Sequence, residues 1–429
     1  MPSGPSIQER TVQPAETAEQ ARDVDELAQH SHYQNVELPG GVSTGGRDRS
    51  PTAHAILPAD LRGKTLLDVG CRVGYFCFEA VRRGAKRVVG LDHNAGALAQ
   101  ARELAKRLGM DVEFRLANAN RELPSEPFDY VLGLNVLHHL RDPIAALEQL
   151  GAITRERLVL EMAGFGRNDR RNLGISAPLA LLLSRLPVIY AAPTGLRGRR
   201  SIPRFYVAEP ALRNLLLRHQ RTFARVDTLR SPLKRRYLAV AYKRRIGDLV
   251  VIAGPLGAGQ ASLIDRLRRG ELAGLAEQIG LGSPAAWRSS RGRDLDQLTE
   301  PEIPKLLLHY DLPGATLDSG EDPLAIVATA ERVTFVTLSC SAEALRRGLD
   351  AEPVLASVWR SRLFQGRRHA QIRAIYADPE KVEACYRAWL ERVRHYPGAR
   401  HVLVREGEGR LFSDDLPAGA GASGSIAPR

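Results

Sequence analysis

The 429-residue sequence predicts an α/β protein of two domains, each built around a parallel sheet. From His54 to Glu161, short apolar runs alternate with amphipathic segments, as strands and helices alternate in such a sheet. A glycine turn follows the first strongly apolar run. Near Ile246, a second buried strand leads into another glycine-rich loop. The length also suits two domains of ordinary size better than one.

The stretch Leu66–Asn94 organises the first domain. Leu66, Leu67 and Val69 form an apolar run, which indicates a strand buried on both faces of a parallel sheet. Gly70 and Gly74 bracket the next turn, where missing Cβ atoms allow unusual φ angles and the close approach of a ligand. The helix that follows presents free N–H groups, which suit an anionic group.

An acid at the end of the second strand suggests which ligand binds. Asp92 closes the run Val88–Asp92, 18 residues after Gly74, where a carboxylate can accept hydrogen bonds from ribose hydroxyls. A dinucleotide fingerprint requires glycine at the first, third and sixth turn positions, but this turn has Gly70, Arg72 and Tyr75 there. The pattern therefore favours S-adenosylmethionine, with Arg72 as a cation that could pair with its carboxylate.

The remaining elements continue the alternation. Asn94 is placed to cap a helix that Gly109 ends, and Asp142 with Pro143 is placed to open another. Further strands are expected at Val112–Leu116, Tyr130–Leu134 and Leu158–Leu160. After an interruption, a helix at Glu209–His219 and an antiparallel pair at Phe223–Leu229 and Tyr237–Tyr242 are expected to complete seven strands.

Residues 66–162 resemble a class I S-adenosylmethionine-dependent methyltransferase. The resemblance depends on the turn GCRVGYF, the spaced Asp92 and the later FDYVLGLNVLHHLRDP. The segment from His32 to Asp92, with HYQNVELPGGVSTGG and LRGKTLLDVGC, is further similar to methyltransferases related to the tRNA wobble-uridine carboxymethyl-transfer enzyme. This resemblance implies a Rossmann-like seven-stranded methyltransferase sheet with S-adenosyl-L-methionine as cofactor.

The resemblance also implies roles for individual residues. Asp68 and the turn Gly70–Gly74 would hold the methionine part, Asp92 the ribose, and Asn118 or Asn120 the adenine edge. Asn135, His138 and His139 follow the fourth strand, where it opens onto the cofactor pocket. Either histidine could accept a proton from the nucleophile. Alternatively, one histidine is packed and the other solvated, without a catalytic role.

The second domain resembles a degenerate P-loop domain of kinase or sulfotransferase ancestry. Gly254 and Gly259 have the P-loop spacing, but Gln260 stands where the phosphate-binding lysine belongs, and Ala261 replaces the Mg²⁺-binding Ser or Thr. Asp311 ends a strand as a Walker B acid does. A structural or binding role is favoured, while phosphoryl and sulfuryl transfer stay open. Arg362, Arg367 and Arg368 resemble an arginine-bearing kinase lid.

The net charge of +12 is unevenly distributed. Residues 155–245 contain 21 Lys and Arg against 5 Asp and Glu. This excess predicts an anionic partner (RNA, anionic lipid or a phosphorylated substrate) or reflects a compositional bias towards arginine. Within this segment, an apolar insertion contains Arg185 and three prolines, so no transmembrane segment is predicted. A cap over the methyl-transfer pocket is favoured over a membrane-surface element.

The predicted organisation has four parts: a disordered segment 1–30, a methyltransferase domain 31–245 with the cap insertion at about 165–208, a P-loop-like domain 246–412 and a disordered tail 413–429. Four cysteines without metal-ligand spacing predict a cytoplasmic protein and no metal site. The predicted function is methyl transfer to a small molecule, sugar or tRNA. A bifunctional enzyme and a non-catalytic ligand-binding regulator remain alternatives.

Overall fold

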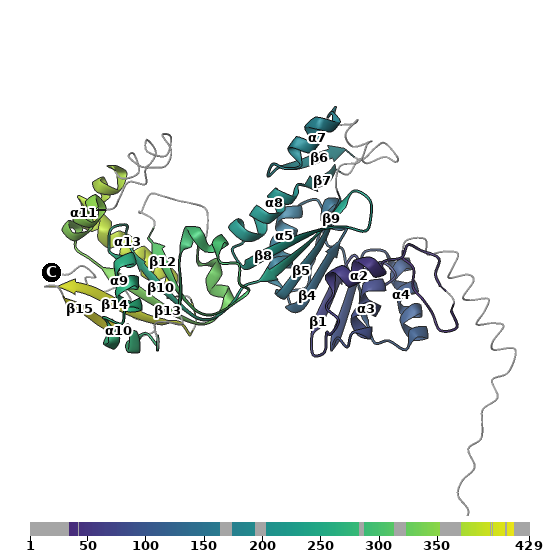
Figure 1. Cartoon of the computed structure of the whole chain (residues 1–429), viewed down its shortest axis with the longest axis horizontal. Coiled ribbons are helices and arrows are strands. Elements are labelled where there is room, and N and C mark those ends of the chain that lie inside the picture. The colour runs from purple at the N-terminus through teal and green to yellow at the C-terminus, as the bar shows by residue number, and fades with distance from the viewer. Residues whose placement is uncertain are drawn as a thin grey trace, which may run out of the picture. The chain divides into compact units, whose positions relative to one another are not determined.

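The chain folds into two compact units (Figure 1). Unit 1 comprises residues up to Asn214 together with Val226–Tyr242, and unit 2 comprises Leu215–Arg225 together with the residues from Lys243 onward. The computed structural model describes residues 34–41, 43–163, 174–193, 203–282, 287–312, 323–351, 370–394, 396, 398–407 and 410–415.

Unit 1 contains the predicted seven-stranded sheet, with the strand order β3-β2-β1-β4-β5-β9-β8. The strands are β1 (Thr65–Val69), β2 (Arg87–Asp92), β3 (Glu113–Leu116), β4 (Phe128–Leu134), β5 (Thr154–Ala163), β8 (Phe223–Arg230) and β9 (Arg236–Lys243). The strands β1 to β5 pair in parallel, and β9 joins β5 in the antiparallel sense. The strand order reverses between β1 and β4, because β2 and β3 are added on one side of β1 and β4 and β5 on the other. Ligands bind at such a switch point, outside the carboxyl ends of the strands.

Local sequence explains where the helices of unit 1 begin and end. The side chain of Asn94 accepts from the Ala97 amide at the start of α4, and Gly109 ends that helix in the left-handed conformation. The side chain of Asp142 caps α5 in the same way. The helices are α2 (Ser50–Ile56), α3 (Tyr75–Arg82), α4 (Ala95–Leu108), η1 (Leu137–His139), α5 (Pro143–Ala152) and α8 (Glu209–Asn214).

The insertion after β5 is described from residue 174. It contains the helix α7 (Ala177–Leu183) and an antiparallel hairpin of β6 (Ile189–Pro193) and β7 (Pro203–Val207). The strand β7 packs against η1 and β5, next to the end of β4. The strand β7 therefore attaches the insertion to the sheet beside β5 and η1, and its role as a cap over the pocket stays a prediction.

Unit 2 is a second α/β unit with the strand order β11-β12-β10-β13-β14-β15. All neighbours pair in parallel except β14 and β15. The strands are β10 (Arg245–Gly254), β11 (Arg288–Arg291), β12 (Glu302–Asp311), β13 (Ala330–Ser339), β14 (Arg400–Gly407) and β15 (Arg410–Asp415). The helices are η2 (Leu215–His219), α9 (Gln260–Arg268), α10 (Ala273–Gln278), η4 (Gly292–Gln297), η5 (Pro323–Thr329), α11 (Ala342–Ala351) and α13 (Pro379–Val393).

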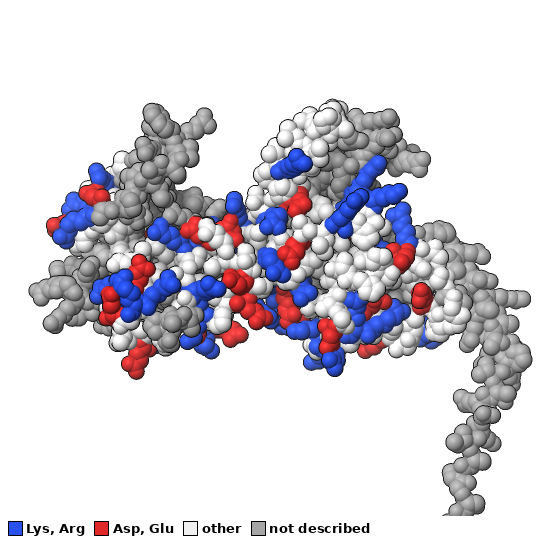
Figure 2. All heavy atoms as spheres, in the orientation of Figure 1, with Lys and Arg blue, Asp and Glu red and all other residues white. Residues whose placement is uncertain are grey.

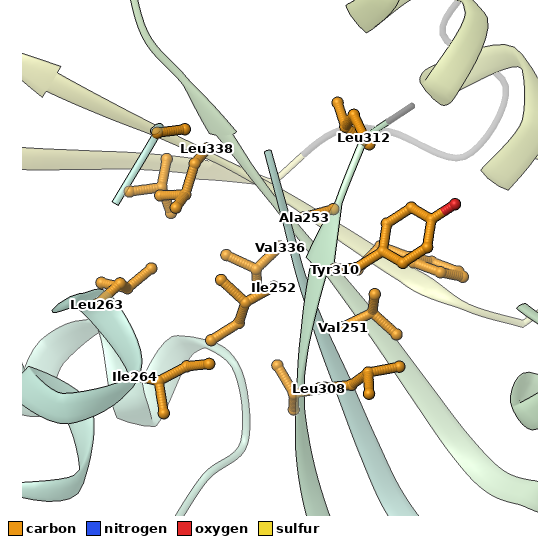
Figure 3. Packing of buried hydrophobic residues seen from close by; sticks show 14 of the residues in the cluster. Val251, Ile252, Ala253, Leu263, Ile264, Leu308, Tyr310, Leu312, Val336 and Leu338 are labelled. Atoms are coloured by element: carbon orange, nitrogen blue, oxygen red, sulfur yellow. The ribbon is translucent and has the colours of Figure 1, made fainter. Parts of the chain in front are cut away.

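The core of unit 2 lies where α9 covers its central strands. Leu263 and Ile264 of α9 point toward Ile252 of β10 and Val336 of β13 (Figure 3), and all four side chains are buried. The apolar run Leu249–Ala253 forms the carboxyl half of β10 and is buried, so it can be covered on both faces. The loop Gly254–Gly259 therefore follows the buried end of this central strand.

Three details differ from the sequence expectations. The predicted helix Glu209–His219 is divided into α8 and the π-helical η2, and residues 215–225 belong to unit 2. Arg218 pairs with Asp296 there, at 2.9 Å. Ser413–Asp415, predicted to start the disordered tail, instead extend β15. Residues 1–33 and the 416–429 part of the tail lie outside the described residues, as do Arg362, Arg367 and Arg368.

Candidate functional site

The glycine turn has three residues in the left-handed region. The φ angles are 77° at Gly70, 56° at Arg72 and 88° at Gly74. The amides of Gly70 and Cys71 both donate to the Leu91 carbonyl, at 2.7 and 2.9 Å, which ties the turn to β2. A Cβ at Gly70 would lie 2.6 Å from Val136 Cγ2, so a side chain there would also fill the space beside the end of β4.

The side chain of Asp92 stabilises this turn through hydrogen bonds to backbone amides. Its side chain is buried, Oδ2 accepts from the Arg72 amide, and Oδ1 accepts from the Asn94 amide, both at 2.9 Å. A carboxylate has about four acceptor positions, so these two bonds leave capacity for two ligand hydroxyls. Asp92 therefore has a structural role at the turn and at the start of α4, and its predicted binding of a ribose stays a prediction.

Arg72 contributes its backbone to the site. Its amide faces Asp92, and the positive φ angle directs the chain sharply through the turn. The pairing of its guanidinium with a ligand carboxylate, predicted from the sequence, stays a prediction.

Asp68 lies one strand away and is buried in β1. Cys77 Sγ donates to its Oδ2 at 3.9 Å. Burial, and after it the nearby negative charge of Asp92, raises the pKa of Asp68 to about 7, although the positive charge of Arg49 and the hydrogen bond from Cys77 act to lower it. The carboxyl group of Asp68 therefore changes its protonation state near neutral pH.

We expect the unfolding free energy of unit 1 to depend on pH through the titration of Asp68. From its ordinary pKa of 3.8 up to about 7, the folded state keeps a proton that the unfolded chain has lost. Stability should therefore fall as pH rises through this window, by on the order of 4 kcal/mol, and level off above it. The change should be measured as the difference in unfolding free energy between the wild type and Asp68→Asn, by far-UV circular dichroism. A difference that is constant from pH 4 to 8 would contradict the assignment.

A buried polar network, which sequence reasoning missed as a site, occupies the ends of β4 and β5. Arg49 pairs with Glu161 at 2.8 Å, and their side chains are 3% and 0% exposed. Ser231 Oγ donates to Glu161 Oε1, and Asn135 Nδ2 donates to Glu161 Oε2. Arg236 lies 3.8 Å from the same carboxylate. Glu161 is the centre of this network.

Asn135 connects the network to the cofactor side. It adopts a φ angle of 64°, and its amide donates to the Glu161 carbonyl at 2.9 Å. Among the described residues, its buried Oδ1 has no hydrogen-bond partner. A buried acceptor without a donor is costly, and a bound ligand with an N–H or O–H group would satisfy it.

The two predicted catalytic histidines differ in environment. In η1, His138 is 4% exposed, His139 is exposed, and their ring centroids are 4.0 Å apart. One packed and one exposed ring is the arrangement that the non-catalytic alternative expects. The exposed ring of His139 is nevertheless the one that could meet an acceptor from solvent.

The asparagines after β3 are engaged in turns. Asn118 Oδ1 accepts from the Asn120 amide at 3.0 Å, and Asn120 Oδ1 accepts from the Arg141 amide at 2.7 Å. The Asn120 contact links this turn to the chain beyond η1. The two side chains line the same edge of the sheet as Asp92, whose carbonyl accepts from the Ala117 amide.

In unit 2 the predicted phosphate-binding residues lie close together, and their side chains contact one another and the loop backbone. The buried Gln260 donates through Nε2 to the carbonyls of Gly254, at 2.6 Å, and Pro255, at 3.2 Å. It also lies 3.3 Å from Asp311 Oδ1, which His309 Nε2 contacts at 2.9 Å. Gly259 has a φ angle of 88° and precedes α9. The glutamine amide thus binds the loop itself.

Within the described parts of the chain, no group of three His, Cys, Asp or Glu side chains is arranged to hold a metal ion. Nor does any helix there have the length and apolar character needed to cross a bilayer.

Comparisons with known proteins concern unit 1. Residues 60–169 match the family model described as "Methyltransferase domain". The tRNA U34 carboxymethyltransferase of Klebsiella pneumoniae subsp. pneumoniae is 38% identical over 117 residues, covering 25% of this chain and 35% of that protein. The ubiquinone biosynthesis O-methyltransferase of Rhodopseudomonas palustris is 32% identical over 108 residues, covering 25% and 42%. The chain therefore spans well under half the length of these curated relatives.

Among solved structures, the N-terminal domain of EvdMO1, crystallised in the presence of SAH and D-fucose, is 19% identical with a TM-score of 0.41. It covers 53% of this chain and 97% of that chain. The matched segment 60–169 holds the glycine turn, Asp92, Asn135 and Glu161. For this segment, the prediction of a methyltransferase domain is confirmed.

Proposed function

We propose that unit 1 binds S-adenosylmethionine and transfers its methyl group to an acceptor that is a small molecule, a sugar or a tRNA. The observation that carries the proposal is the turn Gly70–Gly74 anchored on buried Asp92, inside the segment that matches a methyltransferase family. The proposal assigns Asp92 to the ribose hydroxyls and Asn118 or Asn120 to the adenine edge.

The residues present fit this cofactor. Asp68, Gly70, Arg72 and Gly74 surround the place assigned to its methionine part. The turn requires glycine at two of these positions, because a Cβ at Gly70 would lie 2.6 Å from Val136 Cγ2 and a Cβ at Gly74 would lie 2.9 Å from the Phe114 ring. The unsatisfied Oδ1 of Asn135 offers an acceptor for its N–H or O–H groups. S-adenosylmethionine supplies an electrophilic methyl group, so the main task of the protein is to hold donor and acceptor in line.

A histidine completes the proposed chemistry when the acceptor is a hydroxyl or amine. Such a nucleophile must lose a proton, and an imidazole can accept it near neutral pH. We assign this role to His139, because its ring is exposed at the edge where an acceptor would arrive. His138, which is buried beside it, would position that ring through the 4.0 Å contact.

The class of acceptor is proposed from the names of two relatives. The relatives include one named for tRNA U34 and one named for ubiquinone biosynthesis, so both RNA and small-molecule acceptors fit. A cytoplasmic location belongs to the same proposal, and it is supported by four buried cysteines of which none forms a disulfide. A regulator that binds the cofactor without turnover is the non-enzymatic alternative.

Calorimetry of the full chain with S-adenosylmethionine and S-adenosylhomocysteine tests the proposal first. Incubation with a methyl-labelled donor and pools of tRNA or small molecules then tests transfer. Binding of both compounds together with labelled product supports the enzyme. Binding without any labelled product would favour the regulator, and absence of binding would contradict both.

For unit 2 we propose that the loop Gly254–Gly259 is a degenerate P-loop that serves a structural role. The loop follows the central strand β10, and Asp311 ends the adjacent β12, as the two phosphate-site motifs do in P-loop proteins. The amide of Gln260 binds the Gly254 and Pro255 carbonyls, whereas a phosphate site needs an ammonium directed at the ligand.

We expect Gln260→Ala to destabilise unit 2 by about 1–3 kcal/mol, because buried carbonyls lose a donor. All three tryptophans (Trp287, Trp359 and Trp389) belong to unit 2, so denaturation followed by tryptophan fluorescence reports on this unit. Gln297→Ala, at an exposed position of η4, is the matched control and should have little effect. Tight Mg²⁺-dependent ATP binding by the wild type would contradict the structural role and support the bifunctional alternative.

A further inference from the structure

The helix α7 exposes leucine side chains on more than one face. The exposed fractions are 44% for Leu179, 59% for Leu181 and 57% for Leu182, and none of the helix's residues is buried. At about 100° per residue, Leu179 and Leu182 lie about 60° apart around the helix, whereas Leu181 lies about 160° from Leu179 and about 100° from Leu182. Leu186 and Ile189, which follow the helix, are also exposed. Exposing these apolar side chains to water on several faces of the helix gives no stabilisation.

The hairpin strand β7, which follows α7 in the chain, is packed against the sheet of unit 1. Tyr206 and Val207 of β7 are buried, and the Tyr237 hydroxyl of β9 donates to the Val207 carbonyl at 2.8 Å. The strand β7 also packs against η1 and β5. The exposed leucines are therefore carried by a hairpin that the sheet holds in place.

A basic turn accompanies the apolar helix. The turn between β8 and β9 exposes Arg230, Lys234 and Arg235. Through Tyr237, the same β9 is bonded to β7, at the base of the hairpin. Figure 2 shows Lys and Arg side chains gathered next to the uncharged surface of the α7 region. Apolar and cationic groups thus lie beside each other on unit 1.

We propose that α7 and the basic turn Arg230–Arg235 form a docking surface for an anionic lipid bilayer. Leucines that project from several sides of a helix can all be buried at the boundary between headgroups and acyl chains, and cations beside them attract anionic headgroups. RNA phosphates would engage the basic turn but would leave the leucines in water. A groove on a protein would cover one face of α7 and leave Leu181 or Leu182 exposed.

Co-sedimentation of the full chain with vesicles tests this proposal. One set of vesicles contains phosphatidylcholine alone, and the other contains equal parts of phosphatidylcholine and phosphatidylglycerol. The wild type should bind the anionic vesicles and bind the neutral ones at least ~10-fold more weakly, since each basic residue near the surface adds to the attraction. No sedimentation with either set would overturn the proposal.

Two variants separate the apolar and the charged contributions. Leu181→Glu combined with Leu182→Glu, and separately Lys234→Glu combined with Arg235→Glu, should each weaken binding to anionic vesicles at least ~10-fold. Leu116→Glu, at a leucine of β3 that is 61% exposed and lies outside the proposed surface, is the matched control and should bind as the wild type does. All these side chains are exposed, and an unchanged circular dichroism spectrum should show that the variants are folded.

Other occupants give different results. If the leucine variant binds vesicles as well as the wild type, the basic turn alone acts and a bilayer-inserted α7 is refuted. If the leucine variant instead abolishes self-association in analytical ultracentrifugation, a second copy of the chain covers α7. If the wild type binds tRNA but sediments with neither set of vesicles, the basic turn binds RNA and the lipid proposal is refuted.

Discussion

Asp92→Ala is expected to abolish measurable binding of S-adenosylmethionine to the full chain. A hydrogen bond to a charged group is worth about 1.5–3 kcal/mol, and the proposal gives Asp92 two ribose hydroxyls. Their loss should weaken binding by at least ~100-fold. The turn should also loosen, because the Arg72 and Asn94 amides lose their acceptor. Calorimetry measures the affinity.

Two further variants make this result specific. Asp111→Ala removes an exposed acid of the same unit and should leave the affinity unchanged. Asp92→Asn keeps one side-chain oxygen for the backbone and should preserve more of the fold than the alanine variant while still losing affinity. A folded Asp92→Ala protein with the affinity of the wild type would refute the ribose assignment and leave Asp92 as a purely structural acid.

Glu161→Ala is expected to destabilise unit 1 by about 3–5 kcal/mol. The change leaves the guanidinium of Arg49 buried without its carboxylate, and an uncompensated buried charge has a cost of this size. Asn135 and Ser231 lose their acceptor in the same step. Because Asn135 also lies beside the cofactor turn, binding of S-adenosylmethionine should weaken too.

The two units allow this loss to be located. Far-UV circular dichroism in urea follows both units, whereas tryptophan fluorescence follows unit 2. The part of the circular dichroism transition that comes from unit 1 should therefore move to lower urea, while the fluorescence transition of unit 2 stays in place. Arg82→Ala, which breaks a pair of an exposed arginine with Glu79, should cost less than ~1 kcal/mol. An equally small effect of Glu161→Ala would show that the buried network contributes little.

The sequence predicted the sheet of unit 1 because its local signals agree. Asn94 and Gly109 mark the ends of α4, Asp142 opens α5, and apolar runs mark the strands. The turn and Asp92 were also within reach, because glycines and a strand-end acid are separated by a characteristic distance in the chain. Each of these signals lies within about 20 residues of its partner.

The buried network could not be predicted in the same way. Arg49 lies 112 residues from Glu161, and Ser231 lies 70 residues from it. No local pattern marks an arginine that will be buried, since most arginines remain exposed. One signal was present: Glu161 directly follows an apolar run, at the edge of the sheet where polar side chains meet. Gln260 was noticed as a departure from the P-loop pattern, but its inward bond to Gly254 depends on the folded loop.

The position of Arg49 decides where this protein can be shortened. The family match begins at residue 60, and a recombinant fragment designed to start there would lack Arg49. It would also lose Val36 and Leu38, which are buried in the core of unit 1, and the guanidinium that covers the Phe76 ring at 5.2 Å. We expect such a fragment to aggregate during expression, whereas one that begins before residue 34 should keep Glu161 neutralised and remain folded.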